Sequence, residues 1–240
     1  MYSGNYAKQS LNEVTIAYIK DRILSGELKS GDKIVESDIS EALGISRAPV
    51  REGLRELNTS GLLTYFPRRG SYVLEMTQEE LQEAFEIRIS LELQVLNMLI
   101  RKGVLDDDDF AKLASMNAKL ASFEGSAQDQ REKLYNLNYL DISFHRYLWQ
   151  ASKSYKRYHL LDDLFFQLLI AMNRDVVTLG TLSEKAEEHE NIRSALQKRS
   201  YDDVFEAFQN HLREYMAAII PGAELLDLSP CTSLFVDVLQ

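Results

Sequence analysis

The stretch from Leu43 to Gly61 constrains the fold more than any other part of the chain. It reads LGISRAPVREGLRELNTSG. Three arginines recur at every fourth residue and would line one face of a helix: Arg47, Arg51 and Arg55. An apolar stripe runs between them: Val50, Leu54 and Leu57. Ser46 stands at the N-cap position and Gly61 where a glycine would end the helix. The stretch therefore predicts a helix with one basic face and one face packed on another element.

The residues on either side of this helix predict a winged helix-turn-helix. The short apolar segment 39–43 and the turn residue Gly44 would supply the preceding helix and the tight turn. Segments 62–65 and 71–74 predict two strands, and the turn between them is basic: Arg68, Arg69 and Gly70. A basic hairpin after such a helix is typical of a wing. The alternative is a surface helix with solvated arginines beside an unrelated hairpin.

The charge is distributed unevenly along the chain. Of 27 Lys and Arg and 37 Asp and Glu, residues 1–76 hold ten of each, so the net charge of −10 comes from the rest. Residues 46–70 contain five arginines and two acidic residues, Glu52 and Glu56, so their net charge is +3. A local basic patch suits contact with a phosphate backbone, and an acidic remainder would confine DNA to that face.

Composition also bounds the location of the protein. One cysteine, Cys231, allows no internal disulfide and fits a reducing compartment. The first ten residues lack the apolar core of a signal peptide. The longest apolar run, 164–172, contains Gln167 and is far shorter than the roughly 18 residues that indicate a membrane helix. We therefore expect a cytoplasmic protein that does not enter a membrane.

The remainder of the chain has helical periodicity throughout. We expect six helices, at about 78–101, 107–124, 128–152, 155–178, 183–198 and 201–219. The fold class is therefore mainly α, with an N-terminal winged helix-turn-helix and a C-terminal all-α antiparallel bundle. The expected domains are 1–76, 77–221 and a C-terminal tail at 222–240, which is either loose or a strap on a partner chain.

Polar side chains interrupt the apolar faces of three of these helices. Asp141 and His145 lie one turn apart among Leu134, Leu137, Phe144 and Leu148. His189 shares a face with Ile192 and Leu196, and His211 shares one with Val204 and Phe208. Burying such groups unpaired is costly, and a divalent metal would satisfy all four together. The alternative is a set of hydrogen-bonded core histidines. The fourth histidine, His159, lies off its apolar stripe and is expected on the surface.

Two arginines could accompany this site. Arg88 shares the stripe of Ala84, Leu91 and Val95, so its guanidinium should point inward and could clamp a carboxylate ligand. Arg174 lies between Ile170 and Val177 and is a second candidate. For both residues the alternative is a structural salt bridge. The metal would be zinc first, with nickel or manganese also suited to imidazole and carboxylate ligands.

The N-terminal runs GISRAPVREGLREL, GLL and RRGSYV resemble the winged helix-turn-helix of the GntR family of bacterial transcription regulators. The resemblance covers about the first 76 residues. It implies that Arg47 and Arg51 contact operator bases and phosphates, and that Gly70 sits at the wing tip near the minor groove. Gly53 departs from the family, which usually has alanine there, and should cost about 1 kcal/mol of helix propensity. Ser37 replaces an arginine that contacts DNA in some members.

The runs LDISFHRYL, EHENIRSAL and QNHL resemble the FCD ligand-binding domain of the FadR-like branch, and EIRISLE at 86–92 resembles its first helix. The resemblance implies a metal held by Asp141, His145, His189 and His211, completed by water or an effector carboxylate. Six helices indicate the VanR-like subgroup. Ser154 replaces the usual asparagine, which we expect to change only local capping.

Together these features predict a homodimeric transcription regulator, a repressor, that binds double-stranded operator DNA and is no enzyme. Its helical domain would bind a divalent metal and a small organic acid that modulates operator binding. Two alternatives stay open. One is a metal-dependent enzyme on the helical bundle, and the other is a regulator whose metal is purely structural.

Overall fold

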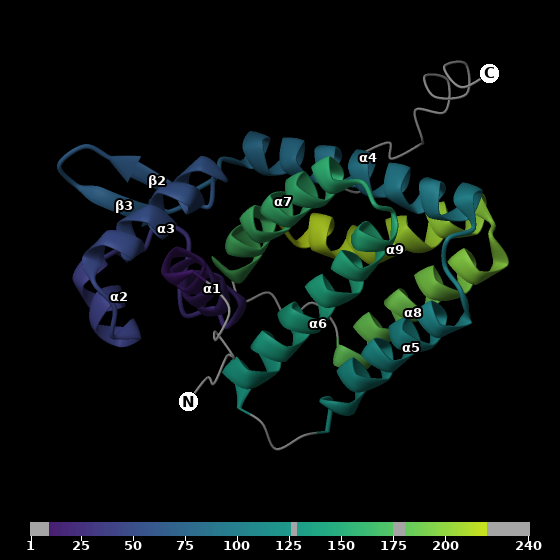
Figure 1. Ribbon diagram of the computed structural model, residues 1–240. Helices are drawn as coiled ribbons and strands as arrows, with labels where there is room; N and C mark the ends of the chain where they lie inside the picture. The colour runs from purple at the N-terminus through teal and green to yellow at the C-terminus, as the bar shows by residue number, and fades with distance from the viewer. Residues whose placement is uncertain (1–9, 126–128, 175–180, 220–240) are drawn as a thin grey trace, which may run out of the picture.

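A winged helix-turn-helix forms the N-terminal part of the protein (Figure 1). The computed structural model describes residues 10–125, 129–174 and 181–219. Its N-terminal elements are α1 (Leu11–Leu24), β1 (Lys33–Ile34), α2 (Glu36–Leu43), α3 (Arg47–Thr59), β2 (Leu63–Phe66) and β3 (Gly70–Val73). The antiparallel sheet has the order β1-β3-β2, with Lys33 opposite Tyr72 and Tyr65 opposite Ser71.

The predicted helix-turn-helix and wing are confirmed, with small shifts. Gly44 and Gly61 both have positive φ, as turn and helix-ending glycines require. Each strand of the wing is shifted by one residue from its predicted range: β2 begins and ends one residue later, and β3 begins and ends one residue earlier. Strand β1 was not predicted, because a strand of two residues carries no readable alternation.

Gly53 is the point of closest approach between α3 and α1. A Cβ atom at this position would lie 2.9 Å from the Thr15 Cβ and 3.0 Å from the Asn12 carbonyl oxygen. The apolar stripe of α3 is buried beside this contact, with Val50 fully buried and Leu57 1% exposed. The glycine therefore lets the two helices pack closely, which explains the departure from alanine noted in the sequence.

We expect Gly53→Ala to lower the stability of the protein. Alanine should gain about 1 kcal/mol of helix propensity, but overpacking against a neighbouring backbone typically costs about 1–3 kcal/mol. Urea denaturation should show a net loss of free energy of unfolding. Gly125→Ala is the matched control, because a Cβ there meets no atom within 4 Å. A Gly53→Ala protein more stable than the parent would show that α1 and α3 can separate without cost.

Six helices follow the wing in the part of the chain that the structure describes, as the sequence predicted. They are α4 (Gln78–Lys102), α5 (Asp107–Ser122), α6 (Gln130–Ala151), α7 (Tyr155–Arg174), α8 (Leu182–Lys198) and α9 (Tyr201–Ile219). The predicted extension of α7 to residue 178 and the tail at 222–240 fall outside the described residues. Among the helices that are described, none combines the length and the apolar character needed to cross a membrane.

The bundle packs its helices in neighbouring pairs, and it also contacts the winged helix. Figure 1 shows α5 and α8 side by side, and α8 also packs on α9. The first helix of the bundle, α4, has Thr77 as its N-cap, and the Thr77 hydroxyl accepts the Glu80 N–H at 3.2 Å in a capping box. On the other side, α1 of the winged helix lies against both α6 and α7. The two parts of the molecule therefore share an interface through α1.

Candidate metal centre and DNA-binding face

The structure brings together the four residues that the sequence nominated as metal ligands. Asp141 and His145 come from α6, His189 from α8 and His211 from α9. Each offers a ligand atom, and these atoms all lie within 4.8 Å of one another. The three histidines are 1% exposed and Asp141 is 7% exposed. Three helices thus converge on one buried polar cluster.

The spacing of the ligand atoms fits a small divalent cation. The Nε2 atoms of His145 and His211 are 3.1 Å apart. His189 Nε2 lies 3.1 Å from Asp141 Oδ1, yet both are buried without a hydrogen-bond partner among the described residues. Bond lengths of about 2.0–2.1 Å to zinc give tetrahedral ligand separations of about 3.3 Å. The four atoms therefore face a common centre more than they face each other.

Two outer carboxylates orient the histidines toward that centre. Glu92 Oε1 lies 2.6 Å from His145 Nδ1, and Glu188 Oε2 lies 2.9 Å from His211 Nδ1. A carboxylate only accepts hydrogen bonds, so each Nδ1 atom directs an N–H at the carboxylate that it faces. The two Nε2 atoms then face each other across 3.1 Å. Either a proton or a metal ion between the two rings satisfies this contact, and a metal ion would also satisfy His189 and Asp141.

The electrostatics of the cluster also suit a metal. Burial lowers the pKa of His189 and, more strongly, that of His211, so both rings are neutral at pH 7. Burial raises the pKa of Asp141, but the three facing imidazoles outweigh it and hold the pKa well below its usual range. Burial likewise raises the pKa of Glu92, and His145 and Arg88 bring it down to about 2. His189 and His211 are thus present as neutral imidazoles and Asp141 as a carboxylate, the forms that bind metals.

Neither outer carboxylate was assigned a role from the sequence. Glu92 and Glu188 lie within the runs EIRISLE and EHENIRSAL, but the apolar stripes of their helices gave no sign of the contact. Glu92 also accepts a hydrogen bond from the Trp149 indole at 3.0 Å. Its position four residues after Arg88 on one helix was the available signal, because such a pair shares a helix face.

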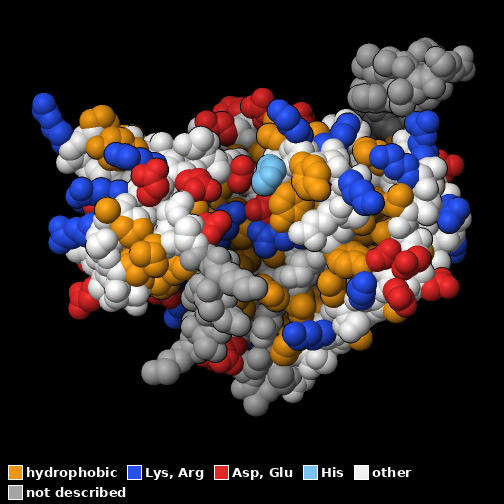
Figure 2. Space-filling model, in the orientation of Figure 1, with side chains coloured by type: hydrophobic (Ala, Val, Ile, Leu, Met, Phe, Trp, Pro, Cys, Tyr) orange, Lys and Arg blue, Asp and Glu red, His pale blue; other side chains and the backbone are white. Residues whose placement is uncertain are grey.

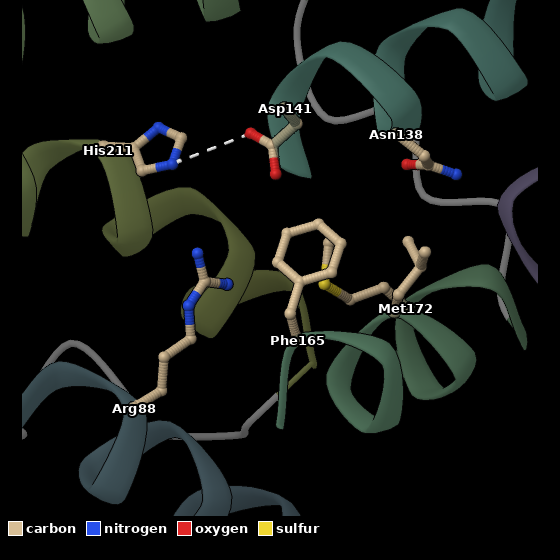
Figure 3. Close-up of a pocket in the computed structure, with 7 residues that line it drawn as sticks. Arg88, Asn138, Asp141, Phe165, Met172 and His211 are labelled. Atoms are coloured by element: carbon tan, nitrogen blue, oxygen red, sulfur yellow. Dashed lines mark ion pairs between the residues drawn. The ribbon is translucent and has the colours of Figure 1, made fainter. Parts of the chain in front are cut away.

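Arg88 lies beside the buried Asp/His cluster, and one of its guanidinium nitrogens makes no hydrogen bond among the described residues. Its Nε donates to Glu92 Oε2 at 2.8 Å, so the salt bridge considered as an alternative is present. Its Nη2 atom is buried without a hydrogen-bond partner in the described part of the chain. Figure 3 shows the guanidinium directed toward the space between His211 and Phe165. Arg88 is therefore paired and still has a donor left for a ligand.

A small pocket adjoins the cluster at this point. It is lined by Arg88, Asn138, Asp141, Phe165, Leu169, Met172 and His211. Its cavity volume is about 10 Å³, which is room for about one water molecule. Asp141 and His211 belong both to this pocket and to the buried cluster.

Two other polar residues were considered from the sequence, Arg174 and His159. Arg174 is the last residue of α7, and its side chain lies outside the described part of the structure. His159 is exposed, as the sequence predicted.

The basic face lies on the winged helix, at the opposite end of the molecule from the bundle. Five arginines on this face are exposed: Arg47, Arg51, Arg55, Arg68 and Arg69. Figure 2 shows blue side chains along the edge where Figure 1 places α3 and the wing. Arg51 Nε is held by Glu36 Oε2 of α2 at 2.7 Å, an anchor that the sequence did not reveal. Ser46 occupies the N-cap position of α3 without a side-chain capping bond, so its exposed hydroxyl is not used by the helix.

The wing has a rigid, basic tip. Arg69 lies over the Phe66 and Tyr72 rings at 5.6 and 5.7 Å from their centroids, and these rings pack edge to face. Arg68 has φ of 65° and Gly70 has φ of 95°. A non-glycine residue in the left-handed region costs about 1–2 kcal/mol, so the turn holds an arginine where glycine would be easier. Such strain is often kept at functional positions.

Comparison with known proteins agrees with both halves of this description. Residues 11–73 match the bacterial regulatory proteins of the gntR family, and residues 83–214 match the FCD domain. The gluconate operon transcriptional repressor of Bacillus subtilis is 26% identical over 152 residues, which cover 63% of this chain and 59% of that protein. The HTH-type transcriptional repressor GlaR of Escherichia coli is 23% identical over 201 residues, which cover 81% of this chain and 89% of that protein.

A solved structure has the same fold. The E. coli McbR/YncC structure superposes with a TM-score of 0.76 at 20% identity, covering 88% of this chain and 97% of that one. The chain spans about three fifths of the length of the Bacillus subtilis relatives that it matches. The two matched domains together account for most of the described elements. The chain therefore belongs to the GntR family of bacterial regulatory proteins, in the FadR-like branch that carries an FCD domain.

Proposed function

We propose that the protein is a repressor that binds a palindromic operator as a homodimer and releases it when a small organic acid binds beside a metal. The observation that carries this proposal is the pocket in which the unpartnered Nη2 of Arg88 lies with Asp141 and His211. A carboxylate there could bind the metal and Arg88 at once. The Bacillus and E. coli relatives are both repressors by name, which supports the direction of regulation.

The roles of individual residues follow from the geometry. Asp141, His145, His189 and His211 would hold the metal, zinc in preference to nickel or manganese, as a Lewis acid for the ligand carboxylate. The DNA-binding residues would be Arg47, Arg51, Arg55, Ser46, Arg68, Arg69 and Gly70, all on α3 or the wing. Acting on the chromosome places the protein in the cytoplasm. The proposal also includes the domain bounds, which are 1–76 for the DNA-binding domain, 77–221 for the helical domain and 222–240 for the tail. It assigns the protein to the VanR-like subgroup.

Operator binding should respond to an acid only when the metal centre is intact. An operator can be selected from random duplexes by the zinc-loaded protein and its affinity measured by fluorescence anisotropy. Acetate, lactate, D-gluconate and citrate are suitable first ligands, since the gluconate operon repressor is among the relatives. Coupling of about 1–3 kcal/mol would lower operator affinity 5- to 150-fold.

Arg88→Lys is the matched variant for this experiment. Lysine keeps a positive charge beside Glu92 but loses the planar fork that binds a carboxylate bidentately. Losing one charge-assisted hydrogen bond should weaken the acid response about tenfold or more. Acid binding to the zinc-loaded protein but not to His189→Ala would separate a ligand-binding metal from a purely structural one. Equal operator affinity with and without every acid would refute the sensor role.

A further inference from the structure

Three side-chain amides of the helical domain cap helices of the winged helix. Asn138 Nδ2 of α6 donates to the Leu24 carbonyl at 2.8 Å, and Asn173 Nδ2 of α7 donates to the Ile23 carbonyl at 2.7 Å. Gln167 Nε2 donates to the Ser60 carbonyl, at the end of α3, at 2.9 Å. The last carbonyls of a helix have no partner within it, so Asn138 and Gln167 satisfy groups that would otherwise need water. The Ile23 carbonyl also accepts the Gly26 N–H at 3.0 Å, so Asn173 adds a second donor there. The helical domain therefore holds α1 and α3 by their C-terminal ends.

These contacts are buried, so losing one of them would cost free energy. Asn138 and Asn173 are each 6% exposed, and Ile23 is fully buried. A buried carbonyl left without a donor costs about 1–3 kcal/mol. Any movement of α1 would also move α3, the helix that carries Arg47, Arg51 and Arg55. The two helices pack so closely at Gly53 that a Cβ atom would not fit between them. The amide contacts thus join the helical domain to the helix that carries the exposed arginines of the winged helix.

Asn138 differs from the other two amides because it also lines the pocket. It lies three residues before Asp141 on α6, on the same helix face. Its bond to Leu24 uses one amide N–H, and Figure 3 shows its oxygen on the Asp141 side and its nitrogen on the opposite side. A ligand in the pocket would therefore touch the same amide group that holds α1.

We propose that Asn138 is the positioning residue that couples the pocket to the DNA-binding domain. A ligand that hydrogen-bonds to the Asn138 amide competes with the Leu24 carbonyl for its orientation, and α1 loosens from the pocket wall. This inference rests on the proposed function, because it assigns the route by which the same ligand acts. One hydrogen bond, worth about 0.5–1.5 kcal/mol net, corresponds to a two- to tenfold change in affinity, within the range of allosteric coupling.

The test compares Asn138→Leu with Asn173→Leu in the full chain. Both substitutions keep the branched shape and the number of heavy atoms and remove one N–H donor to a carbonyl of α1, but only Asn138 lines the pocket. Without any acid, Asn138→Leu should change the operator affinity of the zinc-loaded protein two- to tenfold. It should also accelerate hydrogen exchange of the amides from Ser25 to Leu28, which depend on the end of α1. Unchanged affinity and exchange would overturn the proposal.

The second arm adds D-gluconate, the probe acid. The operator response of the wild-type protein should disappear in Asn138→Leu and persist in Asn173→Leu, whereas a merely structural role would affect both variants alike. A response that survives in Asn138→Leu would overturn the proposal. A wild-type protein that ignores D-gluconate and every other acid would count against the proposed function alone, and the acid-free comparison would still decide the role of Asn138.

Discussion

Purified wild-type protein is expected to contain about one metal ion per chain, and the Asp141→Ala/His145→Ala variant none. The variant removes two of four ligand atoms that lie within 4.8 Å of one another, both from α6. Three or four ligands are typical of protein zinc sites, and two are too few to retain the ion through purification. Elemental analysis after dialysis against metal-free buffer measures the content directly.

Metal binding should also appear as stability. A ligand that binds only the folded protein raises the free energy of unfolding by about 4 kcal/mol at a thousandfold excess over its dissociation constant. Added zinc should therefore raise the melting temperature of the wild-type protein and leave that of the double variant unchanged. His159→Ala is the matched control, because His159 is an exposed histidine away from the cluster. It should keep both the metal and the zinc-dependent stability.

The double variant could lose its fold, because His145→Ala leaves the buried Glu92 with one partner fewer. Asp141→Asn avoids this difficulty, since the amide has the same shape and removes only the charge of the ligand. It should weaken zinc binding while keeping the helical content of the wild type. Wild-type protein that takes up neither zinc, nickel nor manganese would return the histidines to the role of hydrogen-bonded core residues.

The sequence predicted the helices and the buried cluster of one aspartate and three histidines because both depend on short-range periodicity. Asp141, His145, His189 and His211 all interrupt apolar stripes, so each had to face the interior and meet the others. Arg88 was predicted to point inward by the same reasoning, and its side chain is 4% exposed.

The outer contacts were not predictable in this way. The bond between Glu92 and His145 depends on how α4 crosses α6, which no local pattern encodes. The same is true of the close contact at Gly53, which needs the path of α1 across α3. Asn138 gave no signal either, because a single buried asparagine on a helix resembles any other polar residue. Residues whose roles depend on a partner distant in the chain became visible only in the structure.

Replacing Arg51 by alanine is expected to reduce operator affinity by about 30-fold or more. A side chain that contacts a base or phosphate contributes about 1–3 kcal/mol. A homodimer on a palindromic operator uses each residue twice, so one substitution removes about 2–6 kcal/mol in total. Arg51 suits this role because it is exposed on α3, and Glu36 holds its guanidinium in a fixed orientation at 2.7 Å. Anisotropy titrations with the selected operator measure the loss.

The fold should not suffer from this substitution. The Arg51 side chain is 58% exposed, and an exposed ion pair such as the one with Glu36 contributes little to stability. Urea denaturation of Arg51→Ala should therefore match the wild type, and zinc content should not change. Arg101→Ala, an exposed arginine at the end of α4, removes the same charge away from the winged helix and should bind operator normally. A loss of binding free energy of only about 1–3 kcal/mol, the value for one contact, would indicate that a single winged helix binds the DNA. If Arg51→Ala bound the operator as tightly as the wild type, the DNA-reading surface would have to lie elsewhere on the winged helix.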